Sequence, residues 1–175
     1  MDDVAVASGV GKGTLYRYFR SKRDLYLAVT FEGIGRLRRE IEAAMRTAEP
    51  PARKLERIVR CTLGYFWDRR GFFALIHQHE HRPDRDVREW WRRRQELVQL
   101  VQGAFDQAIA AAQVRRIDSR IATEMLFGMM RGVNRYHSAE DTMEAMVAAV
   151  VETLMYGVGT PLGRRALGRP RAARA

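Results

Sequence analysis

The sequence predicts an all-α protein. Long stretches rich in alanine, leucine, methionine, arginine and glutamate favour helix, and only five prolines occur in 175 residues. Apolar residues recur at three- and four-residue intervals through most of the chain, which is the period of an amphipathic helix, and no useful length of chain alternates as a half-buried strand does. A chain of this length buries one sizeable core.

The first elements are short. Asp2 to Ser8 is expected to form one helix and Lys12 to Phe19 a second. The residues between them, Gly9-Val10-Gly11, suit a tight turn because glycine accepts a positive φ without steric cost.

A long helix is predicted next. Ser21 is a natural N-cap, with Asp24 at the third helical position, and apolar residues recur from there to about Thr47. Pro50 and Pro51 end this helix, and Pro51 suits the first turn of the following one. That following helix has the clearest apolar face in the chain, made of Leu55, Ile58, Val59, Thr62, Leu63 and Phe66.

Proline and N-cap residues predict where most of the remaining helices begin. A short helix is expected over Phe72 to His79, a long one opened by Pro83, one capped by Asp118, and a last one begun by Ser138 with Asp141 three residues on. The helix after Asp118 carries an apolar stripe of Ile121, Met125, Met129 and Val133.

Charge and composition limit the function classes. The net charge of +10 indicates an anionic partner such as nucleic acid, although Arg164 to Ala175 holds five arginines and no acid and so supplies half of that excess. Cys61 is the only cysteine, which points to a reducing compartment. No apolar run approaches the ~20 residues of a membrane span, and the first residues do not resemble a signal peptide. We therefore expect a cytoplasmic protein with no membrane partner.

The opening residues have the spacing of a helix-turn-helix, whose second helix enters the major groove of DNA. An apolar seam of Val4, Val10, Leu15 and Phe19 can hold the two helices together. The side chains then available to double-stranded DNA are Lys12, Thr14, Tyr16, Arg17, Tyr18 and Lys22.

The stretch VAVASGVGKGTLYRYFRSKRDL resembles the DNA-binding signature of the TetR family of bacterial transcriptional regulators. The matching positions are Val4, Ala5, Ser8, Gly9, Val10, Lys12, Gly13, Thr14, Leu15, Tyr16, Phe19, Ser21, Lys22, Asp24 and Leu25. Gly11 departs, since the family commonly has a small hydroxyl there. The resemblance implies that Gly13 and Tyr16 approach base edges, and that the DNA backbone is bound by Lys12, Thr14, Tyr18 and Lys22, with Arg17 as a further contact.

The resemblance also implies a regulator, a repressor released from a palindromic operator by a small apolar or aromatic effector. Its helix-turn-helix domain would span 1–30, and a helical ligand-binding and dimerisation domain would span 31–160. The arginines of 161–175 predict a basic, disordered tail. Candidate effector residues are Tyr65, Phe66, Phe72, Phe73, Trp90, Phe105, Met125 and Met129. Each of them is also explained by burial in the core.

A homodimer is the implied assembly, because in this family the last two helices of each subunit form a four-helix bundle. Gly128 and Gly132 stand four residues apart and would let another helix approach closely. Packing within one chain explains the same spacing.

Other kinds of site find little support, and no cofactor is expected. HQHEH at 77–81 places His77 and His81 on one helix face with Glu80 nearby, but no fourth zinc ligand is evident, and a polar helix end or effector contact is the favoured explanation. The chain is not expected to be an enzyme: Cys61 lies on a core-facing side, and GVGKGT lacks the spacing of a nucleotide-binding loop.

The family has a helix before its helix-turn-helix, and Met1 falls where that helix has already ended. One explanation is a chain start assigned too late, which the complete recognition helix favours. The alternative is a short form that dimerises and binds ligand without effective DNA binding. In either case the helix-turn-helix of this chain is expected to be loosely held, since exposing two of its large apolar side chains would cost about 3 to 6 kcal/mol.

Overall fold

The computed structural model describes residues 1–67 and 85–157. This part of the chain contains no strand, and its helices are α1 (Asp2–Ser8), α2 (Lys12–Tyr18), α3 (Lys22–Met45), α4 (Pro51–Trp67), α6 (Arg85–Ala110), α7 (Ser119–Tyr136) and α8 (Met143–Tyr156). The all-α prediction is confirmed. The short helix expected over Phe72 to His79, the start expected at Pro83 and the basic tail lie outside the described residues.

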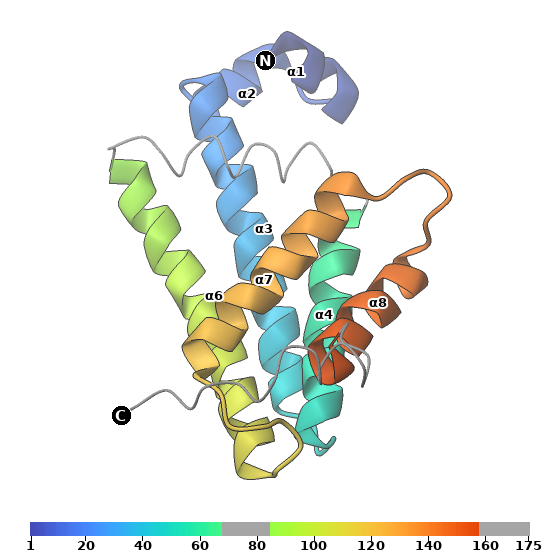
Figure 1. The fold of residues 1–175 in the computed structure, drawn as a ribbon. Coiled ribbons are helices and arrows are strands. Elements are labelled where there is room, and N and C mark those ends of the chain that lie inside the picture. Colours follow the sequence, from blue (N-terminus) through green and yellow to red (C-terminus); the bar gives the residue numbers. More distant parts are fainter. Residues whose placement is uncertain (68–84, 158–175) are drawn as a thin grey trace.

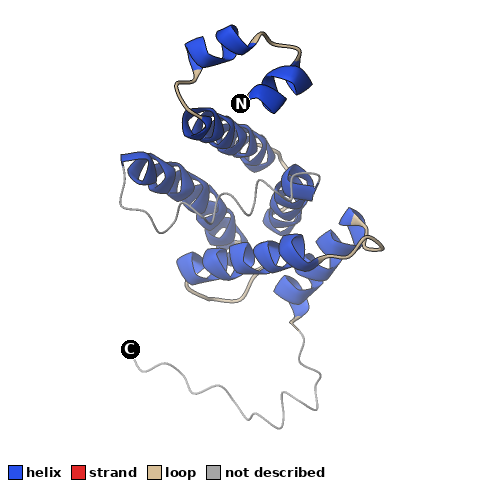
Figure 2. Cartoon of the chain, turned by 90° about the horizontal axis from the view of Figure 1, so that it is seen from above, coloured by secondary structure: helices blue, strands red, loops and turns tan. Residues whose placement is uncertain are grey.

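The helices form a bundle with a small module at one end (Figure 1). α3 runs from α1 and α2 at that end into the bundle, where it packs against α4 and α6. α7 packs against α6 and α4, and α8 packs mainly against α4. Seen from above, α3 lies between α6 and α4, and α7 crosses on the side away from α3 (Figure 2). The α1–α2 module therefore stands on a helix whose other half is part of the core.

The core is where α3, α4, α6 and α7 meet, and α8 adds Val147 and Val150 to it. Each of these helices contributes one apolar stripe to the core, and the side chains of these stripes are buried away from water. The side chains that are almost completely buried are Ile41, Leu55, Ile58, Val59, Leu63, Val101, Phe105, Leu126 and Val147. Burying each such side chain contributes about 1.5 to 3 kcal/mol, which makes this cluster the main source of stability.

Two of the predicted helix starts are confirmed by their caps. The Ser21 hydroxyl oxygen accepts the Asp24 amide at 3.1 Å, and an Asp118 carboxylate oxygen accepts the Ile121 amide at 3.0 Å. Each bond satisfies an amide that the first helical turn leaves without a partner.

The predicted start of the last helix is wrong. α8 begins at Met143 and is capped by Thr142, whose hydroxyl oxygen accepts the Ala145 amide at 3.2 Å. Asp141 instead accepts the Ser138 amide at 2.6 Å. The two polar residues that looked like a cap and its partner therefore close a turn before the helix.

The two expected domains share one helix. α3 is continuous through residues 30 and 31, where the boundary between the DNA-binding and ligand-binding parts was expected. That boundary remains a prediction about function, because the backbone shows no break there. One continuous helix consequently joins the α1–α2 module to the core.

Arginines of α6 fasten it to its neighbours. Arg94 makes two hydrogen bonds to the Glu124 carboxylate of α7, at 2.5 and 3.1 Å. Arg93 lies with its guanidinium carbon 4.8 Å from the centre of the Phe31 ring of α3. These contacts add geometric specificity to an apolar core that is itself nondirectional.

Glu89 gives this network a pH dependence. Hydrogen bonds from Arg92 and Arg93 lower the pKa of the Glu89 carboxyl from 4.5 to about 2. A depressed carboxyl pKa stabilises the fold above the unfolded value and loses that contribution as the pH falls through the folded value. We expect the melting temperature of the wild-type protein to fall more steeply than that of Glu89→Gln between about pH 4.5 and pH 2. Circular dichroism melts at several pH values check this. Glu140→Gln, in an exposed loop position, is the control, and parallel curves for all three proteins would refute the expectation.

Candidate DNA-binding and effector sites

α1 and α2 form a helix-turn-helix. α1 ends at Gly9, which adopts φ 66° and ψ 16°, a left-handed conformation that suits glycine. Ala5 and Leu15 are the buried contacts of the module. Part of the predicted seam is wrong, because Val4 and Val10 are 40% and 39% exposed. The module thus has a very small apolar core of its own.

All of the predicted DNA-binding side chains lie on the exposed surface of this module or at the start of α3. They are Lys12, Gly13, Thr14, Tyr16, Arg17, Tyr18 and Lys22. Residues four apart on α2, such as Lys12 and Tyr16, or Gly13 and Arg17, are neighbours on the helix surface. The predicted DNA-binding residues therefore lie together at one end of the molecule, and the turn between α3 and α4 lies at the other end (Figure 1).

Gly13 has no packing role in the described structure. A Cβ atom built on it would meet no heavy atom within 4 Å. Glycine costs about 1 kcal/mol relative to alanine inside a helix, so an unneeded glycine at this position is unfavourable for folding alone. Close approach of another molecule to the α2 backbone would explain its presence.

Lys12 is held by an acidic side chain of α1. Its ammonium lies 2.6 Å from the Asp2 carboxylate, and both side chains are exposed. The hydrogen bond raises the pKa of Lys12 and lowers the pKa of Asp2. Because this pair is in water, a phosphate can compete with the carboxylate for the ammonium.

The predicted effector residues are divided between the core and the surface. Phe66, Trp90 and Phe105 are buried in the core, and Met129 packs partly buried against it. Met125, in contrast, is 59% exposed on α7. Phe72 and Phe73 lie outside the described residues.

Tyr65 of α4 borders a groove that extends to the helix-turn-helix. Together with Phe19, which follows α2, and Val29 of α3, it lines an open groove of about 430 Å³. Its ring also meets Phe66 edge to face, with centroids 5.0 Å apart. A side chain next to the core therefore borders the same groove as the residue that follows α2.

Four polar side chains of the bundle are buried with unpaired atoms, and of these only Trp90 was predicted from the sequence as a site residue. Within the described structure, no hydrogen-bond partner is found for Thr62 Oγ1, Trp90 Nε1, His137 Nε2 or either side-chain polar atom of Asn134. Native proteins pair most such atoms, so each exception calls for an explanation. The signal was present in the sequence, because Asn134 and His137 continue the helical spacing of Leu126 and Met130 along the buried face of α7.

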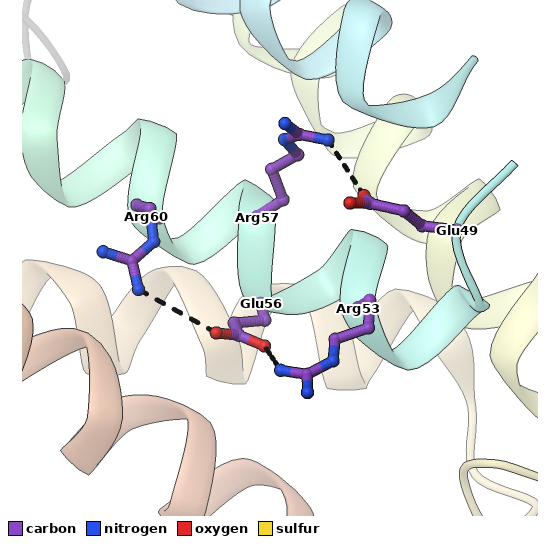
Figure 3. A pocket seen from close by; sticks show the side chains of 5 residues that line it. All are labelled: Glu49, Arg53, Glu56, Arg57 and Arg60. Atoms are coloured by element: carbon purple, nitrogen blue, oxygen red, sulfur yellow. Dashed lines mark hydrogen bonds and ion pairs between the residues drawn. The ribbon is translucent and has the colours of Figure 1, made fainter. Parts of the chain in front are cut away.

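An arginine-rich groove lies on the outer face of α4 (Figure 3). It has a volume of about 320 Å³ and is lined by Glu49, Arg53, Glu56, Arg57 and Arg60. Glu56 lies 2.6 Å from Arg53 and 3.9 Å from Arg60, and Glu49 lies 2.9 Å from Arg57. Each arginine thus already has an acidic partner, which makes the groove a chain of surface ion pairs.

Exposed apolar and small residues occur on α7 and α8, beside the exposed charged residues Arg120, Arg135, Glu144 and Glu152. Ile121, Met125, Tyr136 and Tyr156 are exposed there, with Ala145, Ala148 and Ala149. A Cβ atom on Gly128 or Gly132 would meet nothing within 4 Å in this chain. The two glycines therefore do not serve close packing within the described part of one subunit.

Metal, membrane and nucleophile sites find no support in the described residues. Across 1–67 and 85–157, no cluster of three histidine, cysteine, aspartate or glutamate side chains could hold a metal, and the histidines of 77–81 fall outside these ranges. Within the same ranges no helix is long and apolar enough to cross a membrane. Burial raises the pKa of the Cys61 thiol, which is the reverse of what a nucleophile needs.

Comparison with known proteins agrees with these observations. Residues 1–29 match the model of bacterial regulatory proteins of the tetR family, and residues 48–158 match that of a tetracyclin repressor-like C-terminal domain. The HTH-type transcriptional activator FasR of Mycolicibacterium smegmatis is 30% identical over 81 residues. These residues are 46% of this chain and 37% of FasR, so the match spans little more than a third of that relative.

Solved structures share the fold over most of both chains. A proposed fatty acid metabolism regulator of Clostridium perfringens has a TM-score of 0.78 and 20% identity, over 91% of this chain and 88% of that one. FadR of Bacillus subtilis, in complex with stearoyl-CoA, has a TM-score of 0.74 and 18% identity, over 90% and 88%. With both family models matched in order and the all-helical fold in common, the chain belongs to the TetR family of non-enzymatic bacterial transcriptional regulators.

Proposed function

We propose that this protein is a homodimeric repressor that leaves a palindromic operator when a small molecule with a large apolar or aromatic part binds within its bundle. The observation that carries the proposal is that the seven predicted DNA-binding residues are all exposed and lie on α2 or at the start of α3, whose other half is in the core. Because it acts on DNA, the protein would work in the cytoplasm.

Recognition would use α2 in the major groove. Gly13 and Tyr16 would meet base edges, while Lys12, Thr14, Arg17, Tyr18 and Lys22 would hold phosphates and set the register. The absence of any packing role for Gly13 supports this assignment. Lys12 would exchange its Asp2 partner for a phosphate on binding.

Dimerisation would use the exposed surface of α7 and α8, in a two-fold interface where the same patch of each subunit meets its copy. Gly128 and Gly132 support this, since they open space on an outer helix face that carries exposed Ile121 and Met125. Two recognition helices would then read two half-sites at a spacing that the dimer sets.

Release would follow from a population shift. An effector among α4, α6 and α7 lowers operator affinity only if it binds more tightly to a dimer whose half-site spacing does not fit the operator. A coupling free energy of about 1 to 3 kcal/mol would be typical. α3, and the groove lined by Tyr65 and Phe19, would couple the bundle to the recognition helix. The stearoyl-CoA complex of FadR, which shares this fold, supports an effector with a long apolar part.

Two substitutions test the DNA-binding roles. Lys22→Ala is expected to weaken binding to all DNA sequences about equally and to lower the slope of log affinity against log salt by about one, because one phosphate contact is lost. Tyr16→Ala is expected to reduce operator affinity more than non-specific affinity, by about 1 to 3 kcal/mol. Fluorescence anisotropy over a range of salt concentrations measures both.

Arg53→Ala is the matched control, since it removes one positive charge from the far end of the bundle. It should change neither the slope nor the preference. If Lys22→Ala and Tyr16→Ala both leave operator affinity untouched at fixed salt, the assigned roles are wrong.

The second candidate is a dimer that binds ligand without effective DNA binding. The exposure of Val4 and Val10 favours it, because a module with so small a core can be too loosely held to keep α2 on DNA. This candidate predicts an intact dimer with no sequence preference among DNA duplexes.

A further inference from the structure

Asn134 is the most unusual polar residue of the bundle. It lies on α7, is only 4% exposed, and neither its carbonyl oxygen nor its amide nitrogen has a hydrogen-bond partner in the described structure. Such a group costs stability, which a binding role would explain.

His137 lies beside Asn134 and is a second buried polar side chain with an unpaired atom. It is 8% exposed, and its Nδ1 lies 3.1 Å from the carbonyl oxygen of Asn134, one turn earlier. A carbonyl oxygen only accepts, so Nδ1 carries the proton, and in the neutral ring Nε2 is left as an acceptor. That Nε2 atom is also buried and unpaired within the described structure.

The ring of His137 is fixed by α4. It stacks on Trp67 with centroids 4.1 Å apart and an interplanar angle of 18°. Asn134 and His137 therefore lie at the junction of α4 and α7. There the Trp67 ring adjoins one unpaired donor, the Asn134 amide nitrogen, and two unpaired acceptors, the Asn134 carbonyl oxygen and His137 Nε2. Apolar surface next to a few fixed polar groups is the composition of a small-molecule site.

We infer that Asn134 and His137 are the specificity-determining residues of the effector site, and that the effector presents an amide to them. A carboxamide offers a donor beside an acceptor, so it pairs with the N–H and C=O of another amide through two hydrogen bonds. His137 Nε2 accepts a further N–H or O–H of the same ligand. This inference rests on the proposed ligand-responsive function, and it adds a polar requirement to an otherwise apolar effector.

The test compares two ligands that share an alkyl chain. Decanamide carries N–H donors and methyl decanoate carries none, and calorimetry on the full chain, with no DNA present, gives their affinities. We expect the wild-type protein to prefer decanamide by about tenfold or more. Asn134→Leu should remove this preference, and it should also raise the melting temperature of the free protein because an unpaired buried amide is replaced by an apolar side chain of similar size.

A second variant guards against misfolding. His137→Phe keeps a ring against Trp67 and removes Nε2, so it should bind methyl decanoate normally and decanamide less well. Thr123→Val is the control, since the Thr123 hydroxyl is buried in α7 but already donates to Ser119 O at 2.8 Å. It should keep the full preference for the amide.

Equal affinity of the wild-type protein for both ligands, or binding of neither, would overturn the inference. A preference that survives both Asn134→Leu and His137→Phe would overturn it too. Because no DNA is present, these outcomes are separate from the proposed function, which fails on operator binding.

Discussion

Replacing Gly128 with arginine is expected to lower operator affinity by about 10²- to 10⁴-fold, because a monomer holds one half-site and loses the avidity of two linked recognition helices. Gly128 lies on the outer surface of α7, beside exposed Met125, and has open space above it in a single chain. A charged side chain there is tolerated by a free subunit. Between two closely packed subunits it would be buried without a partner.

Two measurements separate this effect from misfolding. Sedimentation should show a monomer for Gly128→Arg, while its circular dichroism spectrum stays helical. Gly103→Arg is the matched control, because Gly103 of α6 also has no heavy atom near an added Cβ and lies outside the proposed interface. A dimer with unchanged operator affinity for Gly128→Arg would place the interface elsewhere.

Replacing Phe105 with alanine is expected to destabilise the fold by about 3 to 5 kcal/mol. The side chain is 1% exposed and belongs to the core cluster where α3, α4, α6 and α7 meet. The loss combines the transfer of the ring to water with the cavity that remains. For a chain of this size the melting temperature should fall by about 6 to 20 °C.

The same substitution asks whether Phe105 is core or pocket. Phe105→Leu fills most of the space and should recover much of the stability, as a core position requires. Urea unfolding at one fixed protein concentration gives both values, since a dimer's stability depends on concentration. A loss below about 1 kcal/mol for Phe105→Ala would show that the ring is not part of the packed core.

Local sequence signals predicted most of the helices well. Ser21 and Asp118 have polar side chains that cap, and Pro51 opens α4, so α3, α4 and α7 begin where expected. The start of α8 was missed because Ser138 and Asp141 bond to each other across a turn, a choice that spacing does not reveal. The resemblance to the DNA-binding signature of the TetR family identified the helix-turn-helix, but it did not show that Val4 and Val10 remain exposed.

Site residues in the bundle were harder to predict. α7 is apolar on two sides, and periodicity alone does not say that Leu126 and Met130 face the core while Ile121 and Met125 face outward. Asn134 and His137 lie on the buried stripe, but the effector site was predicted from large apolar side chains. Which side of a helix meets a partner or a ligand depends on the packing of distant segments, and the sequence does not state that packing directly.

Selection of bound duplexes from a random DNA library tests the central claim most directly, since the selection itself reveals the operator sequence. The full chain is expected to enrich an inverted repeat with two half-sites at one fixed spacing, and the Gly128→Arg variant is expected to enrich no such pair. Enrichment of no sequence by a folded dimer would contradict the account and favour a ligand-binding dimer without effective DNA binding.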